Sequence, residues 1–427
     1  MDWKLCAIYL ANLLCCLIYD IIAPFYPIEA QTKGVSNFQI GIVFTSMPLT
    51  TCLVSPLIGL SLKVLGRRAT FTGGTAVMGL AMLCMAAADL LPTPGFFGVS
   101  CLARALAGVG SACVFTVCTL HTAYAYIASD YPVRMNEVIA FNEVFSGVGL
   151  MVGPLVGAGF YTLAGYRGMF YCLALVFGLG AWAVLGLLGT DKDYYVASEG
   201  SNTLLKMAGK KEILINCLPL VYSMAAIGFC DTVIAPHLQG FGLTQVEIGF
   251  LWALSDTGYA LFSCFLAKSL DWFNLKRVNL TGLVLAFVSY WLLGPWEALF
   301  PATPLLTMVG LTLISVSVAL HYVAALPNLV QVATRDLGLA KDDILIDSLS
   351  GIVSSANSLG EVIGPLAAGW LVDEVGVSSA GGAQGVAGVA VTAVYLLYYF
   401  CGKHRPAAGV VEMTEIVSGL AVESTQE

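Results

Sequence analysis

One acidic side chain lies inside an apolar stretch of the sequence, where a charge is costly. The stretch is GFCDTVIAP, residues 228–236, and its acid is Asp231. An ionised group at the centre of a membrane helix costs roughly 2.5–3.5 kcal/mol, so such a group usually faces the bundle interior, a partner or a wet cavity. A carboxylate there can hold either a proton or an ammonium group. Asp231 is therefore a candidate cation-binding residue, and a structural hydrogen bond between helices is the alternative.

The surroundings of Asp231 occur twice in the chain. DIIAP at residues 20–24 matches DTVIAP at residues 231–236, and GLMVGP at 149–154 matches GEVIGP at 360–365. The two aspartates are 211 positions apart, and so are the leading glycines of the second pair. Two independent matches at one spacing predict a duplicated unit of parallel repeats, the organisation of a large class of secondary transporters.

The repeat gives Asp231 a counterpart, Asp20. We expect the two carboxylates to face each other across a cavity, one from each half, where they would suit a cationic substrate. The alternative for Asp20 is a gate residue at the mouth, because it lies toward the non-cytosolic end of the first apolar run.

Five further residues in apolar runs could support such a site. Glu143 and Glu361 could each bind an amine or staple two helices by a hydrogen bond. Arg104 is a permanent cation that could compensate Asp20 or Glu143 when those lose their protons, with helix packing as the alternative. Tyr19 and Tyr124 offer rings over which a cation gains about 0.5–2 kcal/mol, with plain packing as the alternative.

The composition is that of a membrane protein. Hydrophobic residues make up 58% of the 427 residues, charged residues only 11%, and the mean hydropathy is +0.85. Apolar windows of about twenty residues, long enough to cross a hydrocarbon core, recur along the chain without the alternation of barrel strands. We predict an all-α membrane protein with twelve transmembrane helices in two parallel six-helix repeats, spanning roughly 3–28, 38–62, 69–91, 96–127, 137–163, 168–189, 213–239, 244–267, 278–299, 303–333, 345–372 and 381–402.

The basic residues predict the orientation, because Lys and Arg prefer cytosolic loops. With the N-terminus inside, 16 of the 19 lie at cytosolic positions, the exceptions being Lys33, Arg104 and Arg167. An even number of spans then places both termini in the cytosol. The predicted domains are an N-terminal bundle at 1–189, a charged cytosolic linker at 190–212, a C-terminal bundle at 213–402 and an acidic cytosolic tail at 403–427.

The glycine-proline runs predict that the two halves move relative to each other. Small residues allow helices to approach closely, and a proline frees a backbone carbonyl and bends a span. This would let one half rock against the other, although packing alone could also explain the spacing. The candidate hinge or gating residues in these runs are Gly149, Gly153, Pro154, Gly364 and Pro365.

Three motifs resemble the major facilitator superfamily. GVGLMVGPLVGAGFY, residues 147–161, looks like the span-five motif of its proton-linked antiporters, and RALAGVG at 104–110 looks like its span-four motif. GLSLKVLGRR, residues 59–68, resembles its loop between spans two and three, which makes Arg67 and Arg68 candidate gating residues. This loop has Val64 or a neighbour where the family normally carries an aspartate.

Within that superfamily the chain resembles the vesicular amine transporters, and among them the polyamine type. The similar stretches are APFYPIEAQTKGVSNFQIGIVF (23–44), NEVFSGVGLMVGPLVG (142–157) and GFCD (228–231). The resemblance extends over nearly the whole chain. It implies binding of a small cationic substrate and of protons.

The sequence thus predicts a proton-coupled antiporter of organic cations, polyamines or monoamines, that loads an acidic compartment by alternating access. The alternatives are a multidrug or other small-solute exporter on the same fold, at the plasma membrane or elsewhere, and a non-transporting receptor or scaffold. Motifs for a metal, a covalent nucleophile or a nucleotide do not occur, so we expect no cofactor, no enzymatic activity and no nucleic-acid partner. We expect a monomer, surrounded by membrane lipid, in a vesicle or another acidic organelle.

Overall fold

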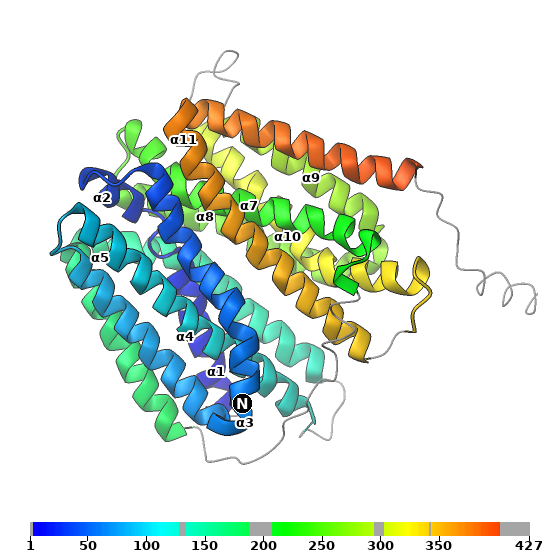
Figure 1. Cartoon of the computed structure of the whole chain (residues 1–427), viewed down its shortest axis with the longest axis horizontal. Coiled ribbons are helices and arrows are strands. Elements are labelled where there is room, and N and C mark those ends of the chain that lie inside the picture. The colour runs from blue at the N-terminus through cyan, green and yellow to red at the C-terminus, as the bar shows by residue number, and fades with distance from the viewer. Residues whose placement is uncertain (1–2, 128–133, 188–206, 294–302, 341–342, 402–427) are drawn as a thin grey trace, which may run out of the picture.

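The computed structural model describes residues 3–127, 134–187, 207–293, 303–340 and 343–401. Within these ranges every regular element is a helix, which confirms the all-α prediction (Figure 1). The helices are α1 (Trp3–Asp20), α2 (Tyr26–Thr32), α3 (Asn37–Ala88), α4 (Thr93–Ile127), α5 (Arg134–Leu187), α7 (Lys211–Gly240), α8 (Gln245–Ser269), η1 (Leu270–Trp272), α9 (Leu275–Leu293), α10 (Pro304–Arg335) and α11 (Asp343–Cys401).

Three of the helices, α3, α5 and α11, each contain two membrane spans joined at a glycine. Gly66, Gly165 and Gly376 have φ of 74°, 70° and 78°, a left-handed conformation that glycine adopts without steric cost. Counting each of these helices as two spans, and α1 with α2 as one, gives the twelve predicted spans. Gly376 follows Gly165 by 211 positions, so the turns obey the same repeat as the motifs.

The first predicted span, 3–28, is wrong in one respect, because the helix is broken. α1 ends at Asp20, residues 21–25 form turns, and α2 starts at Tyr26. Pro24 cannot donate a backbone hydrogen bond and disfavours helical geometry in the residue before it. The counterpart Pro236 is instead accommodated inside α7, which runs unbroken through Asp231 to Gly240. The two copies of the repeat therefore present their aspartates differently, one at a helix end and one within a helix.

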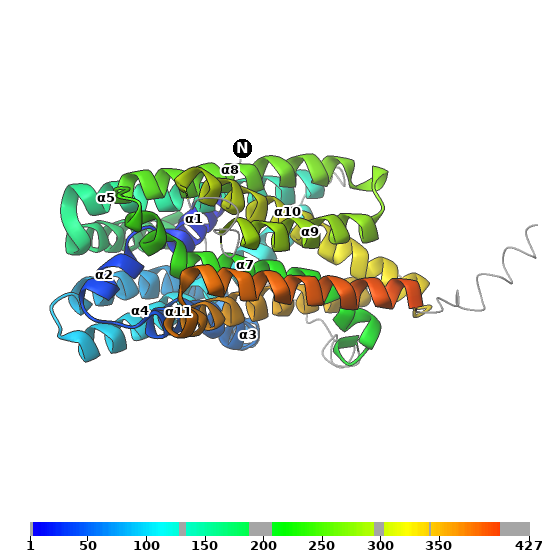
Figure 2. The same cartoon turned by 90° about the horizontal axis from the view of Figure 1, so that it is seen from above.

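The two halves meet along two pairs of helices, α3 with α11 and α5 with α8. Seen from above, α5 and α8 lie along one edge of the bundle, α3 and α11 lie along the other, and α1 and α7 lie between them (Figure 2). Gly41 of α3 packs against the carbonyl of Pro365, and Gly249 of α8 packs against the carbonyl of Pro154. Each proline of the repeated motif thus contacts a glycine of the opposite half.

One end of the α3–α11 contact is fastened by Asp373. Its Oδ1 accepts from the backbone N–H of Asn37 at 3.1 Å and from Asn37 Nδ2 at 2.8 Å, and its Oδ2 accepts from the N–H of Phe38 at 2.9 Å. Thr45 continues the contact by donating to the carbonyl of Val362 at 3.1 Å. Asp373 thereby satisfies the free N–H groups at the start of α3, at the end of the bundle predicted to be non-cytosolic.

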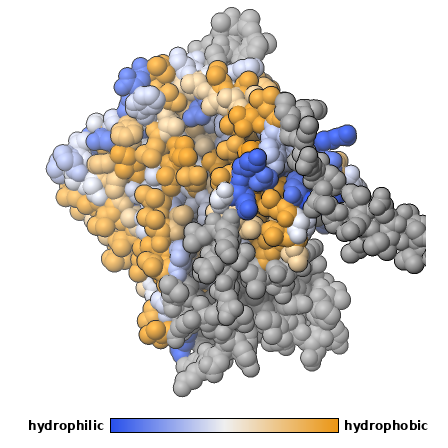
Figure 3. All heavy atoms as spheres, turned by 45° about the vertical axis from the view of Figure 1, so that its right-hand side comes forward, coloured by the Kyte–Doolittle hydropathy of each residue, from blue (hydrophilic) through white to orange (hydrophobic). Residues whose placement is uncertain are grey.

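The surface agrees with a membrane location. Large apolar side chains are widely exposed, among them Leu53 at 65%, Leu163 at 87% and Trp182 at 77%. Figure 3 shows apolar residues covering much of one face of the helices. Exposed apolar area of this extent marks contact with lipid or another apolar partner.

Candidate functional site

Four carboxylates from four helices come together in the interior of the bundle. Asp20 ends α1, Asp231 lies in α7, Asp256 in α8 and Glu361 in α11, and each side chain is half-buried. Asp231 lies within electrostatic range of the other three, and Asp20 within range of Asp256 and Glu361. The N-terminal half supplies one acid and the C-terminal half supplies three, so the cluster bridges the two halves.

Arg104 of α4 is the cation beside these acids. Its side chain is 3% exposed, and its guanidinium lies within electrostatic range of Asp20 and Asp231. It donates to the backbone carbonyls of Ile18 at 3.2 Å and Tyr19 at 3.4 Å. These carbonyls are free to accept because α1 ends at Asp20. The guanidinium of Arg104 therefore lies at the break in the first span, a feature that the sequence pattern did not reveal, and charge compensation by it stays a prediction.

The acids differ in their hydrogen bonds. Oδ1 of Asp231 and Oδ2 of Asp256 are buried atoms for which the described residues provide no hydrogen-bond partner. Glu361 accepts from Nδ2 of Asn357, one turn earlier on α11, at 2.8 Å. A structural staple requires a partner on another helix, and neither of these two oxygens has one in the part of the chain that the structure describes. Both oxygens are instead available to a proton or to a cationic group.

Of the three other predicted substrate residues, the structure describes the side chain of one, Tyr19. Tyr19 is half-buried, lies within electrostatic range of Glu361 and has its ring centroid 6.4 Å from that of Phe115. The side chains of Glu143 and Tyr124 lie outside the described residues.

The two predicted gating arginines follow the Gly66 turn. Arg68 is half-buried at the start of the second span of α3, and the side chain of Arg67 lies outside the described residues.

The predicted hinge glycines hold the repeat helices together inside each half. Gly149 and Gly153 pack against the backbone of α1 at Leu13 and Leu17, and Gly364 packs against the backbone of Ala225 in α7. A side chain at any of these positions would collide with backbone. The glycines therefore fix each motif to its own half, while Pro154 and Pro365 contact the opposite half.

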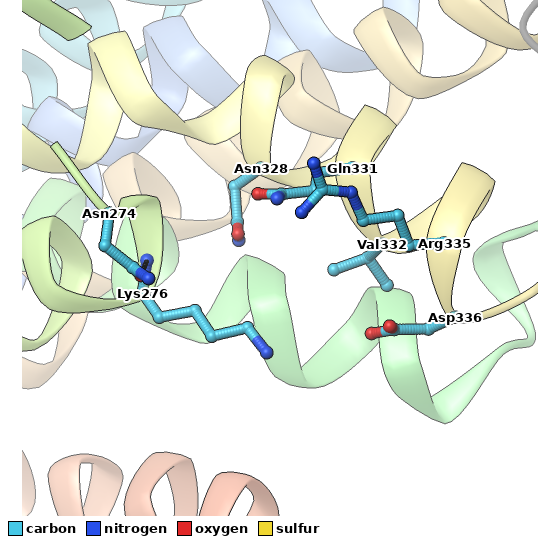
Figure 4. Close-up of a pocket in the computed structure, with 7 residues that line it drawn as sticks. All are labelled: Asn274, Lys276, Asn328, Gln331, Val332, Arg335 and Asp336. Carbon is cyan, nitrogen blue, oxygen red and sulfur yellow. Dashed lines mark hydrogen bonds between the residues drawn. The ribbon is translucent and has the colours of Figure 1, made fainter. Parts of the chain in front are cut away.

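A separate pocket of about 160 Å³ lies where α9 begins and α10 ends (Figure 4). Its lining carries charges of both signs together with amide side chains, and Lys276 Nζ lies 4.2 Å from the ring centroid of Tyr399. The lining residues are Asn274, Lys276, Asn328, Gln331, Val332, Arg335 and Asp336. None of the predicted substrate residues belongs to it.

Comparison with known proteins supports the fold and the family resemblance. The Major Facilitator Superfamily model matches residues 8–340 and 232–415. The MFS-type transporter SLC18B1 of Rattus norvegicus is 27% identical over 394 residues, covering 90% of this chain and 84% of that protein. The vesicular acetylcholine transporter of Mus musculus is 24% identical over 394 residues, covering 88% of this chain and 68% of that protein. These relatives confirm the resemblance to the vesicular amine transporters.

Solved structures share the fold at low sequence identity. A bacterial homolog of the human lysosomal transporter Spinster, in an inward-facing and occupied conformation, aligns with a TM-score of 0.75 and 14% identity over 95% of this chain and 98% of its own. The nucleoside transporter NupG aligns with a TM-score of 0.74 and 12% identity over 94% of this chain and 100% of its own. All these relatives are transporters rather than enzymes. The twelve-span duplicated bundle and the match of the family model together place this chain in the major facilitator superfamily of solute transporters.

Proposed function

We propose that this protein exchanges protons for small organic cations, either polyamines or monoamines, by alternating access. The observation that carries the proposal is the buried Oδ1 of Asp231, which no described residue hydrogen-bonds and which lies within electrostatic range of Asp20 from the other half. An ammonium group supplies both the charge and the hydrogen-bond donors that this oxygen lacks. The similarity to a vesicular acetylcholine transporter, whose named substrate, acetylcholine, is a cation, supports the same class of cargo.

In the proposed cycle the amine and the proton compete for the same carboxylates. An amine entering from the cytosolic side binds Asp231 in its deprotonated form, with Arg104 balancing the remaining negative charge. After the halves rock, protons from an acidic compartment occupy the carboxylates and displace the amine. The protonated carrier then returns and releases its protons to the cytosol. One site that holds either a proton or an amine is sufficient for antiport.

The packing of the halves supports the moving parts in this proposal. The contacts of Gly41 with Pro365 and of Gly249 with Pro154 close one end of the bundle. Under the predicted orientation, with both termini cytosolic, this end is lumenal, which is the closure that the proposed cycle requires of an inward-facing state. The proposed location is the membrane of a vesicle or another acidic organelle, with the monomer as the working unit.

Uptake into proteoliposomes with an acidic interior tests the proposal. Radiolabelled spermidine and serotonin would be compared for the wild type and for Asp231→Asn, with the gradient collapsed by an ionophore as control. We expect gradient-driven uptake of at least one amine in the wild type and none in the variant. Uptake of neither amine, or normal uptake by Asp231→Asn, would show that Asp231 does not bind a cation.

A further inference from the structure

A third aspartate, Asp256, has no structural task that the helices reveal. It lies near the middle of the 25-residue helix α8, where a carboxylate would be most expensive. Its Oδ2 is buried and has no hydrogen-bond partner within the described ranges. The adjacent Ser255 already links α8 to α10, through a 2.8 Å hydrogen bond to Ser315. The helix contact therefore does not need the carboxylate of Asp256.

The charges around Asp256 are predominantly negative. It lies within electrostatic range of Asp20 and Asp231, and Glu361 completes the four acids, against one cation, Arg104, among the described neighbours of Asp231. Four carboxylates and one guanidinium leave an excess of three negative charges when all are ionised. A cargo with one ammonium group compensates only one of these charges. The excess favours a cargo that carries more than one.

The two orphaned oxygens belong to two different helices. Oδ1 of Asp231 is on α7, and Oδ2 of Asp256 is on α8. Because the two acceptor oxygens are on separate helices, each can bind a different positive group, instead of both binding the same one. Trp252 lies one turn before Asp256 on the same face of α8 and is 5% exposed, so an apolar ring accompanies the carboxylate. This combination suits an aliphatic chain that ends in a charged group.

We propose that Asp256 binds the second positive group of an organic dication whose first ammonium group is held by Asp231. The proposal rests on the cation site described above and adds to it a residue that sets the preference for cargo charge. Asp256 discriminates between cargoes by the number of their ammonium groups, and not by overall size.

The test is binding of 1,4-diaminobutane and 1-aminobutane to the purified full-length protein in detergent, measured by calorimetry and by ligand-induced thermal shift. The two probes have the same carbon chain and differ by one ammonium group. We expect Asp256→Asn to weaken diamine binding about tenfold, the loss of one hydrogen bond to a charged group, and to change monoamine binding by less than about twofold. Asp256→Glu should restore part of the diamine preference.

Two controls separate the possible failures. Ser255→Ala removes the link to α10 without changing charge, and should leave the diamine-to-monoamine ratio unchanged. Asp231→Asn should weaken both probes. An Asp256→Asn variant that binds both probes as the wild type does, or weakens both equally, would overturn the role of Asp256 and leave the cation site standing. A wild type that binds neither probe would overturn the cation site itself.

Discussion

Asp89 and Asp231 are acids of the same type in the same bundle, but their surroundings differ. Asp89 follows α3, and its two oxygens bind Lys33 Nζ at 2.8 Å and Arg167 Nε at 2.6 Å. Oδ1 of Asp231 is buried and has no hydrogen-bond partner among the described residues. The contrast separates two uses of a carboxylate. Asp89 forms direct ion pairs that hold turns together, whereas Asp231 has a cation, Arg104, in its vicinity but no ion pair with it among the described residues.

This difference also explains the three exceptions to the distribution of basic residues. Lys33 and Arg167 are the partners of Asp89, and Lys33 Nζ also donates to the Asp89 carbonyl at 3.0 Å. Arg104 is buried beside the central acids. All three basic residues outside the predicted cytosolic loops thus have acids near them, which lowers the cost of their placement.

The largest expected effect comes from removing the cation of the central site. Arg104→Gln leaves the four acids without compensation and frees the carbonyls at the end of α1. Breaking one side of a buried charge arrangement costs about 3–5 kcal/mol, so we expect a drop in the thermal unfolding temperature and a fall in uptake of roughly 100-fold or more. Uptake and unfolding in detergent would be measured side by side.

A second substitution sharpens this prediction. Asp20→Asn in the Arg104→Gln background removes one uncompensated charge, and should recover unfolding temperature without recovering uptake. Arg104→Lys is the matched control, since it keeps the charge and loses the planar fork. Normal stability of Arg104→Gln would contradict the view that the central acids need this cation.

Glu361 should show an intermediate effect, because its carboxylate is partly satisfied. It accepts from Asn357 within the same helix, and Gln can accept the same bond. We expect Glu361→Gln to raise the KM for amine uptake about fivefold, the effect of about 1 kcal/mol, with a smaller change in unfolding temperature. Complete loss of uptake would show that Glu361 is as essential as Asp231. It would contradict the expectation that an acid already hydrogen-bonded by the protein contributes less to transport.

Asp373 is an acid whose hydrogen-bond donors lie in the opposite half of the protein. Asp373→Ala removes the acceptor for the first N–H groups of α3, which is worth about 1 kcal/mol for a helix cap. The closed end should open about fivefold more often, as measured by labelling of Thr45→Cys with a membrane-impermeant maleimide in a background without other reactive cysteines.

The adjacent Glu374 supplies the control for that experiment. Glu374 is exposed and carries the same charge one position further along α11. Glu374→Gln should leave the labelling rate unchanged. Equal rates for Asp373→Ala and the wild type would show that the cap does not hold the halves together.

The smallest effect is expected at Asp89. Partial burial would raise the pKa of its carboxyl, but the hydrogen bonds and charges of Lys33 and Arg167 outweigh burial and hold that pKa below the usual value. The stabilisation is therefore fully present above the pKa of the unfolded chain, about 3.9, and is lost only as pH falls through the lower folded value. Acid in a vesicle should leave this contact intact.

We therefore expect Asp89→Asn to cost about 1 kcal/mol or less, with uptake nearly unchanged. The difference in unfolding temperature between variant and wild type should be constant from pH 8 to about pH 5 and shrink below about pH 4. A difference that already disappears between pH 7 and 5 would contradict the low pKa of Asp89.

Much of the fold could be predicted because the signals are local or repeated. Span lengths follow from hydrophobic runs, and the 211-residue repeat reappears in the turns at Gly165 and Gly376. The break after Asp20 could not be predicted with confidence, because the same motif is tolerated as helix in α7. Position relative to the packed neighbours decided between these outcomes.

The site was predicted in part. A charge within an apolar run identified Asp20, Asp231 and Glu361 without any structure, because such a charge is expensive wherever it lies in a span. Asp256 also lies in an apolar run, but its sequence surroundings do not separate a structural role from a binding role, and only the lack of a described hydrogen-bond partner for its Oδ2 argues against the structural one. The contact of Asp373 with the start of α3 joins residues more than 300 positions apart and left no local signal.

The sequence by itself determined that this chain crosses the membrane as a duplicated helical bundle with acids in its spans, because hydropathy and repeats are properties of contiguous residues. The tertiary structure alone decided which acids are neutralised and which are left unpaired. Lys33 and Arg167 reach Asp89 from two other segments, and no described basic side chain hydrogen-bonds the buried oxygens of Asp231 and Asp256. Whether a charge is paired depends on distances between segments remote in the chain, and those distances exist only in the folded molecule.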